Sequence, residues 1–525
     1  MEFHAESFRG LRELRSLDLG DNNIYTLPSE VFCPLFSLES LNLTNNKIQD
    51  ISDIGFSDWG KGPIAPGKSC NTGLKMLDLS HNNILKLPDN GLSSLRSLEV
   101  LKIQNNLINE IGDRAFVGLN SMKILNLSSN KLVAVPPELF HNGAFSELKN
   151  LHHLSISDNK LKTLNEQIFS NLFVLNQLYL DNNDLSNIHE RCFENITYLQ
   201  DLGLNGNNLN TIPEGLKKLR FLKSLDVGKN NITVVTNSSF EGLEELYGLR
   251  LVDNHIINIP KDTFRWLNIS DNKLIYFDYS YMPATLEWLD IHSNNISKLE
   301  NEHNVQQNIQ MLDVSYNALE IVDKRSIPDS IQTLFLNNNK IHTIRSETFL
   351  QKRNLQKIPM DATELYLDGN NFRVLASHLF IGKKKLHKLY LNNSNIVSVD
   401  NDTFNGLHAL NVLHLENNYL TEIAGGEFSQ TKHLRELYLN DNLLTSVANT
   451  TFENLSSLRV INLQGNKVVD LDKKLTHISH LESVNLRGNY FTCSCENVLP
   501  LQKWFKKYYE DPVESYIRYL IIRRM

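Results

Sequence analysis

Histidine is a side chain that often acts in catalysis or metal binding. The spacing of the histidines in this sequence, however, argues against a catalytic or metal site. His152 and His153 are adjacent, and His477 and His480 are three residues apart, but neither pair has a carboxylate or cysteine at metal-ligand spacing. No Gly-rich phosphate loop, His-Glu-x-x-His or Gly-x-Ser-x-Gly motif occurs. We therefore expect surface or packing histidines, no enzyme activity, and no metal, cofactor or small-molecule substrate.

Asparagines offer a second kind of chemistry, because eleven Asn-x-Ser/Thr sequons can accept N-linked glycans. A chain this rich in asparagine produces several sequons by chance, so their number alone does not indicate modification. The predicted acceptors are Asn42, Asn126, Asn195, Asn231, Asn237, Asn268, Asn295, Asn392, Asn401, Asn449 and Asn454.

Five cysteines are too few to staple a chain of 525 residues, but their positions predict separate roles. Cys192 stands where equivalent segments carry Ala or Thr, so we interpret it as a small buried packing residue. Cys493 and Cys495 form a Cys-x-Cys motif of two half-cystines without partners, or of two unpaired thiols. Cys33 and Cys70 form a disulfide if the chain is extracellular, and are two buried thiols otherwise.

A repeated pattern of leucine and asparagine organises the whole chain. Its first copy, at residues 14–27, reads Leu-x-x-Leu-x-Leu-x-x-Asn-x-Ile-x-x-Leu, and most later copies follow at steps of 22 to 24 residues. Twenty successive copies identify the leucine-rich repeat. The positions of the asparagine are Asn22, Asn46, Asn82, Asn106, Asn130, Asn159, Asn183, Asn207, Asn230, Asn254, Asn272, Asn294, Asn317, Asn339, Asn370, Ser394, Asn418, Asn442, Asn466 and Asn489.

Each part of the pattern has a physical reason. Strand alternation directs the two leucines of Leu-x-Leu into the core and the middle residue outward. The asparagine ends the strand because its amide satisfies turn backbone groups of its own and neighbouring coils. A second apolar set, such as Phe116-x-x-Leu119 or Phe404-x-x-Leu407, anchors the opposite side. We expect an α/β leucine-rich-repeat solenoid of about twenty repeats, a curved horseshoe with a parallel concave sheet and an irregular or short-helical convex side.

Interruptions of the rhythm predict the organisation along the chain. A first repeat block spans residues 1–350 and contains an inserted loop at 52–73; an irregular junction at 351–360 precedes a second block at 361–489. Smaller disturbances are expected near 139–146 and 264–267. Residues 490–525 contain the Cys-x-Cys motif but no later cysteine, so we expect an incomplete cysteine-flanked C-terminal cap. No signal peptide or membrane span is predicted, and we expect the chain to be a fragment, a splice form or the product of a faulty gene model.

The outward-facing middle residues change from mostly polar to aromatic at residue 335. Neighbouring strands lie about 4.8 Å apart, so these rings would form a ladder. Adjacent exposed aromatic residues suit a protein-binding hot spot. The strand propensity of Leu-Tyr-Leu would place the same residues there without a binding role. The row consists of Phe335, Tyr366, Tyr390, His414 and Tyr438, and Trp59 in the inserted loop is a further candidate for partner binding.

Charge narrows the class of partner. The net charge is -8, from 60 acidic and 52 basic residues, and no Lys/Arg block occurs. Such a chain is a poor candidate for binding nucleic acid or an anionic membrane.

The inserted loop carries a family resemblance. Gly-Phe-Ser-Asp-Trp-Gly-Lys-Gly-Pro at residues 55–63, followed by Cys-Asn-Thr-Gly-Leu-Lys at 70–75, resembles the inserted repeat of the long insect Toll receptors, the eighteen-wheeler-like branch. Residues 87–96, 113–119 and 358–372 are similar to the same branch. The resemblance covers most of the chain, but the paired cysteines of the family between two repeat blocks have no counterpart near 352–357.

The resemblance implies a function and a location. It implies an extracellular protein-recognition module at the cell surface that binds a protein ligand, of the cystine-knot cytokine type, or a partner ectodomain, including a second copy of itself. Signalling in immunity or development would then use a cytoplasmic TIR domain that this sequence does not contain. The alternatives are an adhesion or matrix repeat protein without signalling, and an intracellular repeat scaffold, which the Cys-x-Cys motif disfavours.

Overall fold

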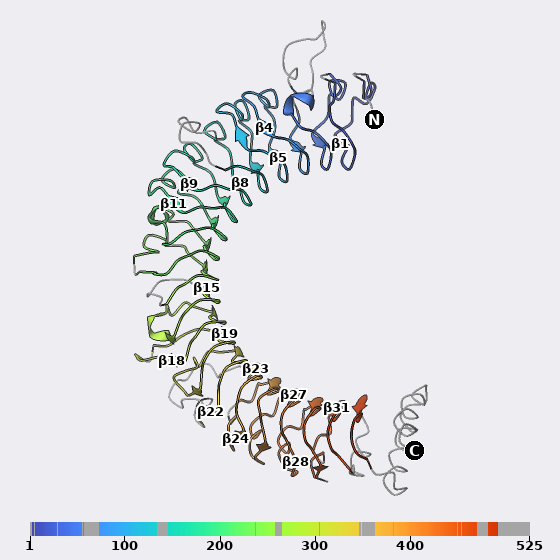
Figure 1. Ribbon diagram of the computed structural model, residues 1–525, viewed down its shortest axis with the longest axis vertical. Helices are drawn as coiled ribbons and strands as arrows, with labels where there is room; N and C mark the ends of the chain where they lie inside the picture. Colours follow the sequence, from blue (N-terminus) through green and yellow to red (C-terminus); the bar gives the residue numbers. More distant parts are fainter. Residues whose placement is uncertain are drawn as a thin grey trace. The chain divides into compact units, whose positions relative to one another are not determined.

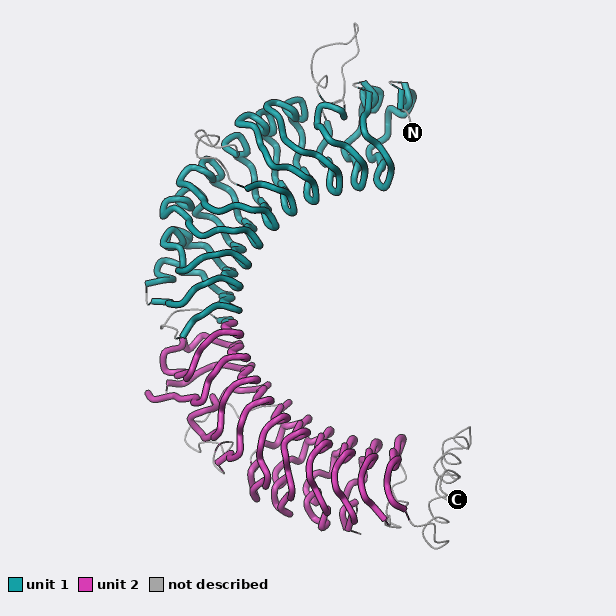
Figure 2. Tube along the Cα trace, in the orientation of Figure 1, with its two compact units in different colours: residues 1–267 teal, residues 268–525 magenta. Residues whose placement is uncertain are grey.

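The structure is a computed structural model that describes residues 3–491, apart from residues 5, 29, 55, 57–72, 134–144, 237, 258–264, 304, 346–347, 349–362, 382, 449, 453 and 470–480. The chain divides into two compact units, unit 1 at Met1–Leu267 and unit 2 at Asn268–Met525 (Figure 2). Each unit is described by itself below.

Unit 1 is built from three-residue main strands, one for each Leu-x-Leu. Successive main strands pair in parallel and in register, so that Leu41 lies opposite Leu77 and Leu178 opposite Leu202. The main strands are β1 (Ser16–Asp18), β2 (Ser40–Asn42), β3 (Met76–Asp78), β5 (Val100–Lys102), β7 (Ile124–Asn126), β8 (His153–Ser155), β10 (Gln177–Tyr179), β12 (Asp201–Gly203), β13 (Ser224–Asp226) and β14 (Gly248–Arg250), with β15 (Trp266–Asn268) at the border between the units.

The outer side of unit 1 is irregular. Two pairs of two-residue strands run along it, and two short 3-10 helices interrupt it (Figure 1). The strand pairs are β4 (Lys86–Leu87) with β6 (Glu110–Ile111) and β9 (Thr163–Leu164) with β11 (Asn187–Ile188); the helices are η1 (Ile51–Ile54) and η3 (Glu214–Lys218).

Unit 2 repeats this design. Its main strands are also parallel and in register, and they line the concave edge of the unit in Figure 1. They are β17 (Trp288–Asp290), β19 (Met311–Asp313), β21 (Thr333–Phe335), β23 (Glu364–Tyr366), β25 (Lys388–Tyr390), β27 (Val412–His414), β29 (Glu436–Tyr438), β31 (Val460–Asn462) and β32 (Ser483–Asn485). The outer strands pair as β16 (Tyr276–Asp278) with β18 (Lys298–Glu300), β20 (Ile321–Val322) with β22 (Thr343–Ile344), β24 (Val374–Leu375) with β26 (Ser398–Val399), and β28 (Glu422–Ile423) with β30 (Ser446–Val447); η4 spans Tyr279–Tyr281.

The predicted solenoid of parallel main strands is confirmed, and its convex side is of the irregular kind. The described residues of the two units together contain twenty main strands, the number of repeats in the sequence. Helix is confined to the three short 3-10 segments η1, η3 and η4 among the described residues.

The repeat asparagine forms a ladder inside each unit, as its chemistry predicts. The Nδ2 group of Asn106 donates to the carbonyl of Ile103 in its own coil at 3.1 Å and to that of Leu79 in the preceding coil at 3.0 Å. Its Oδ1 accepts from the backbone N–H of Ile84 at 3.0 Å. One buried amide thus serves the turn backbone of two coils, where no water can do so.

Ser394 replaces the asparagine in one coil of unit 2 and changes these bonds. Its shorter hydroxyl reaches the carbonyls of Leu367 at 3.2 Å and Asn392 at 3.0 Å. The N–H of Phe372, which an asparagine side chain would otherwise serve, donates instead to the backbone carbonyl of Ser394 at 3.0 Å. The coil keeps its fold because the backbone moves its acceptor into the place of the missing amide oxygen.

Buried phenylalanines hold the outer side of the coils. In unit 1, Phe169 and Phe193 stack at a centroid distance of 6.3 Å. In unit 2, Phe404 stacks on Phe380 at 6.2 Å and on Phe428 at 5.8 Å. All five rings are buried, so the predicted anchoring role of the second apolar set is confirmed, and adjacent coils are joined on both sides.

The irregular steps leave the main ladder intact. Despite the long step before it, β23 pairs directly with β21, with Thr333 opposite Glu364. The expected junction at 351–360 lies outside the described residues, as does most of the inserted loop, so the predicted blocks stay predictions. The disturbance expected near 139–146 falls largely outside the described ranges, and so does the predicted cap at 490–525, apart from residues 490–491. Of the segment at 264–267, residues 265–267 are described, and Trp266 and Leu267 belong to the main strand β15.

Candidate functional site

Five aromatic side chains form a continuous stack on the main strands of unit 2. In-register pairing places Phe335 opposite Tyr366, Tyr366 opposite Tyr390, Tyr390 opposite His414, and His414 opposite Tyr438. The ring centroids are 4.4, 4.4, 4.7 and 4.4 Å apart in that order, and the interplanar angles stay between 5° and 20°. We call these five residues the aromatic row. All five side chains are half-buried, since each ring covers the face of its neighbour.

Acidic side chains stand beside the aromatic row and are tied to its rings. The hydroxyl of Tyr366 donates to Glu364 Oε2 at 2.6 Å, and that of Tyr438 to Glu436 Oε2 at 2.8 Å. Each of these carboxylates begins the strand that its tyrosine ends, and both side chains lie on the outward face because strand residues two apart share a face.

The same neighbours shift the pKa values of the row. Burial, followed by the hydrogen bond to Glu364, raises the pKa of Tyr366. Burial and the hydrogen bond to Glu436 raise the pKa of Tyr438 to about 12. Both phenols therefore stay protonated at physiological pH and act as hydrogen-bond donors.

A second pair of carboxylates lies on the other side of the row. Glu416 Oε1 is 2.9 Å from Nδ1 of His414. Burial raises the pKa of Asp368, and the negative charge of Glu416 raises it further. Lys388 is the one Lys or Arg in strands β21, β23, β25, β27 and β29, and its Nζ is 2.8 Å from Glu364 Oε1. The surface around the aromatic row is therefore predominantly acidic.

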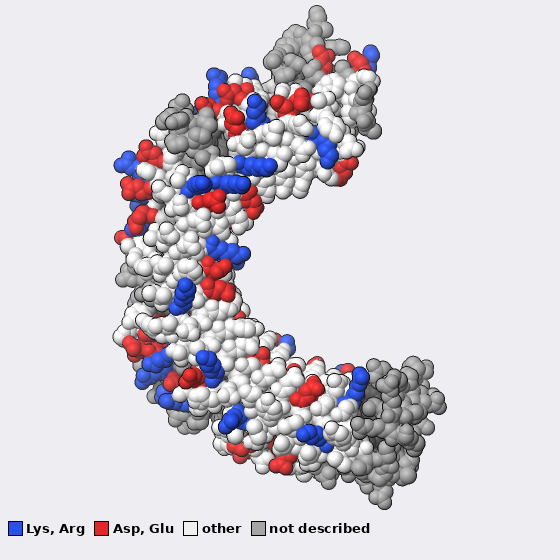
Figure 3. All heavy atoms as spheres, viewed as in Figure 1, with Lys and Arg blue, Asp and Glu red and all other residues white. Residues whose placement is uncertain are grey.

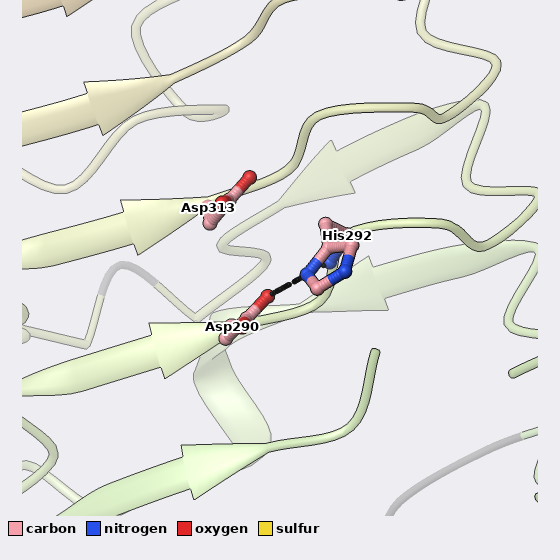
Figure 4. Close-up of side chains that lie close together, drawn as sticks. All are labelled: Asp290, His292 and Asp313. Carbon is pink, nitrogen blue, oxygen red and sulfur yellow. Dashed lines mark hydrogen bonds and ion pairs between the residues drawn. The ribbon is translucent and has the colours of Figure 1, made fainter. Parts of the chain in front are cut away.

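An acidic cluster with one histidine lies on the neighbouring main strands of unit 2 (Figure 4). Asp290 ends β17, Asp313 ends β19, and His292 follows Asp290 by two residues. Nδ1 of His292 is 2.5 Å from Asp290 Oδ1, and its Nε2 is 3.5 Å from Asp271 Oδ2. The hydrogen bond to Asp290 raises the pKa of His292, and burial raises that of Asp313.

These side chains could hold a metal ion. One ligand atom each from Asp290, His292 and Asp313 lies within 4.8 Å of the others, the one such group in the part of the chain that the structure describes. Carboxylates and imidazole suit a divalent cation. The hydrogen bond between His292 and Asp290 also satisfies the histidine without a metal. Sequence reasoning did not single out this cluster, although register could have found it, because Leu-Asp-Ile-His and Leu-Asp-Val occupy equivalent positions in adjacent coils.

The cysteines are only partly described. Cys192 is buried and free, in agreement with the packing role, and burial raises the pKa of its thiol. Cys33 is disulfide-bonded. Cys70, Cys493 and Cys495 lie outside the described residues, so the pairing of Cys33 with Cys70 and the roles of the other two stay predictions, as does the role of Trp59.

The sequon asparagines that the structure describes are all half-buried or exposed, so none is shielded from modification by burial. Asn42, Asn126 and Asn268 lie on the main strands, where glycans would cover part of the concave face. Asn237 and Asn449 lie outside the described residues. Glycosylation itself stays a prediction.

The described histidine pair, His152 and His153, contacts a backbone carbonyl and a glutamine side chain. The ring of His152 contacts the carbonyl of Asn150 at 2.7 Å, and that of His153 contacts Gln177 at 3.0 Å. His477 and His480 lie outside the described ranges.

Charges of both signs are interspersed over the face shown in Figure 3. No helix among the described residues is long and apolar enough to cross a membrane.

Two family profiles match this repeat architecture. The profile "Leucine rich repeat" matches residues 2–58, 72–132, 361–420, 384–444 and 432–491. The profile "BspA type Leucine rich repeat region (6 copies)" matches residues 137–247. A solved structure of a leucine-rich-repeat protein from Leptospira interrogans has a TM-score of 0.52 and 23% identity, and the match covers 82% of this chain and 94% of that one. This likeness is one of fold.

Two curated proteins are similar over shorter stretches. Toll-like receptor 7 of Drosophila melanogaster is 30% identical over 206 residues, 29% of this chain and 14% of that protein. Epiphycan of Gallus gallus is 27% identical over 143 residues, 27% of this chain and 39% of that protein. The chain thus spans well under half the length of either relative. With more than half of its residues matched by the two repeat profiles and one parallel strand in each Leu-x-Leu, the chain belongs to the leucine-rich-repeat proteins.

Proposed function

We propose that this chain is an extracellular protein-recognition module of a Toll-like receptor, of the long insect Toll branch. It binds a protein ligand of the cystine-knot cytokine type, or it pairs with a partner ectodomain, which can be a second copy of this chain. The binding serves immune or developmental signalling at the cell surface. The similarity to Toll-like receptor 7 supports the receptor class, and the resemblance of the inserted loop supports the branch.

The aromatic row is the observation that carries the proposal. The five rings are stacked on consecutive main strands and hold one another in fixed rotamers. These side chains therefore lose little conformational entropy when a partner docks on them. Tyrosines in such clusters are typical hot-spot residues. The proposed mechanism is docking of the ligand along the row, followed by receptor pairing.

Surface plasmon resonance with a panel of Spätzle-type cystine-knot cytokines tests the proposal. The variant Tyr390→Ala/Tyr438→Ala is expected to weaken binding by about 2 kcal/mol or more, roughly thirtyfold in Kd. Folding should persist because the core leucines of the same strands are untouched, and circular dichroism checks this.

A matched control separates the row from aromatic residues in general. Tyr198 and Phe221 in unit 1 also stack, at a centroid distance of 5.4 Å, and both are exposed. The variant Tyr198→Ala/Phe221→Ala should leave cytokine binding unchanged. If no cytokine of the panel binds the wild-type chain, the cytokine class is wrong. If both double variants bind equally well, the aromatic row is not the recognition surface.

The similarity to epiphycan favours a second candidate, a matrix or adhesion repeat protein that binds without signalling. Fusion of the chain to a membrane helix and a reporter-coupled TIR domain distinguishes the two. Ligand-dependent reporter output supports the receptor, whereas ligand binding without output supports the matrix protein.

A further inference from the structure

We propose that the aromatic row and the carboxylates beside it bind an extended segment of a partner protein that is rich in arginine or lysine and lies along the row. This inference rests on the proposed function and names the chemistry of the partner. We call the four carboxylate residues the acidic frame: Glu364, Asp368, Glu416 and Glu436.

The charges of unit 2 around the row are unbalanced. The acidic frame contributes four carboxylates, while the five strands that carry the row, together with the two residues after each strand, contain Lys388 as their one Lys or Arg. Lys388 is itself paired to Glu364. The acidic character continues onto β17 and β19, where Asp290 and Asp313 occupy the positions next in line before Phe335. A cationic occupant would complement this face over several coils.

Hydrogen bonding on the row also calls for donors. The hydroxyls of Tyr366 and Tyr438 are already used, since they donate to Glu364 and Glu436. Carboxylates only accept hydrogen bonds. An occupant that supplies N–H donors, as arginine and lysine do, satisfies these oxygens best.

Ring stacking determines which part of an occupant meets the row. Because the rings cover one another's faces at 4.4 to 4.7 Å, an occupant meets mainly their edges. No flat ligand can insert between two rings at that separation. The aliphatic stem of an arginine or lysine can lie across ring edges while its charged end reaches a carboxylate at the side.

The spacing of the frame fits an extended chain that crosses successive coils. Glu364 and Glu436 are three coils apart, about 14 Å at 4.8 Å per strand, and Asp368 and Glu416 are two coils apart, about 10 Å. An extended segment rises about 3.3 Å per residue, and side chains four residues apart share one face. Basic residues at that interval lie about 13 Å apart, close to the distance between Glu364 and Glu436.

Fluorescence anisotropy on the full chain tests this inference with a defined probe. The probe is a synthetic dodecapeptide with arginine at every fourth position and leucine and serine between, compared with the same peptide carrying glutamate in place of arginine. The arginine peptide should bind, with an affinity that falls as salt rises, and the glutamate peptide should not. The variant Glu364→Gln/Glu436→Gln should weaken binding about tenfold.

The control variant removes the same charge from the other unit. Glu39 and Glu99 each stand just before a main strand of unit 1 and pair with Lys75 and Lys123. The variant Glu39→Gln/Glu99→Gln should leave the affinity for the arginine peptide within about twofold of wild type. Equal losses in both variants, absence of binding, or preference for the glutamate peptide would overturn the inference.

Failure here is distinguishable from failure of the proposed function. If Tyr390→Ala/Tyr438→Ala weakens cytokine binding while Glu364→Gln/Glu436→Gln affects neither cytokine nor arginine peptide, the row recognises a partner but the basic segment is wrong. If the arginine peptide depends on the acidic frame while no cytokine binds, the basic segment stands and the cytokine class is wrong.

Discussion

Asn207 illustrates how one side chain supports a coil of the solenoid. Its Nδ2 donates to the carbonyls of Leu180 at 3.1 Å and Leu204 at 2.9 Å, and its Oδ1 accepts from the N–H of Leu185 at 3.0 Å. Removal of this amide leaves several buried backbone groups without partners, each worth about 1–3 kcal/mol.

The neighbouring residue provides a matched test at the residue scale. Asn207→Ala should lower the free energy of unfolding by about 3 kcal/mol, whereas Asn208→Ala, which changes an exposed side chain, should change it by less than about 0.5 kcal/mol. Urea unfolding followed by circular dichroism measures both. Equal losses of unfolding free energy in the two variants would mean that the side-chain amide of Asn207 does not stabilise the turn.

His292 makes the stability of unit 2 depend on pH. Its hydrogen bond to Asp290 favours the charged imidazolium, so its folded pKa lies above the unfolded value of about 6.5. The resulting stabilisation is fully present below that value and is lost as pH rises through the raised pKa. The raised pKa of Asp313 acts in the same direction, since burial, and then the negative charge of Asp290, disfavours its ionised form in the folded state.

The variant His292→Gln should therefore flatten the pH profile. The difference in Tm between wild type and variant, measured from pH 5.5 to 8.5, should be largest at the acidic end and shrink as pH rises. The carboxylates of Asp271, Asp290 and Asp313 all act on this histidine, so their charges set the position of the change. A Tm difference that stays constant with pH would contradict the assignment.

At the scale of the element, a glycine turn limits how closely successive coils stack. Gly118 has a φ of +89°, and a Cβ added there would lie 2.7 Å from the backbone carbonyl oxygen of Ser93 in the preceding coil. A side chain therefore meets two costs, a left-handed backbone conformation and an overlap with backbone that cannot rotate away.

Gly118→Ala should lower the free energy of unfolding by more than about 2 kcal/mol, from backbone strain and overlap together. Gly10 offers the comparison, because its φ of +95° is similar but no atom lies within 4 Å of an added Cβ. Gly10→Ala should cost less than Gly118→Ala in the same denaturation experiment. The reverse order would show that the overlap is relieved by a shift of the coils.

The strands were predictable because every copy of the leucine-rich repeat shows which residues face the core and which face outward. Each Leu-x-Leu became one main strand, and the outward residues fell in line, so the five members of the aromatic row could be named in advance. The repeat pattern could not predict the orientation of the side chains within the aromatic row. The stacking of the rings, and the hydrogen bonds from Tyr366 to Glu364 and from Tyr438 to Glu436, depend on rotamers that only neighbouring side chains determine.

Irregular segments limited the prediction in a different way. The step between Asn339 and Asn370 is long, yet β21 and β23 pair directly. Extra residues between two strands do not disturb their pairing when the register is fixed by Leu334 opposite Leu365. The Asp290, His292 and Asp313 cluster was missed because its members come from two coils and match no short motif.

At the scale of the whole molecule, we propose that one face of unit 2 recognises a protein. The aromatic row and the acidic frame supply the contacts, and unit 1 contributes repeats of the same construction whose outward residues are mixed in character. Exposed tyrosines occur in both units, among them Tyr25, Tyr198 and Tyr247 in unit 1. The oxidation of tyrosine side chains can therefore be compared between the aromatic row and unit 1 in one experiment.

Hydroxyl-radical footprinting of the chain with and without a bound cystine-knot cytokine tests this claim most directly. The oxidation rates of Tyr366, Tyr390 and Tyr438 should fall several-fold in the complex, while those of Tyr198 and Tyr247 stay unchanged. Unchanged rates along the aromatic row, with protection of Tyr198 or Tyr247 instead, would contradict the account.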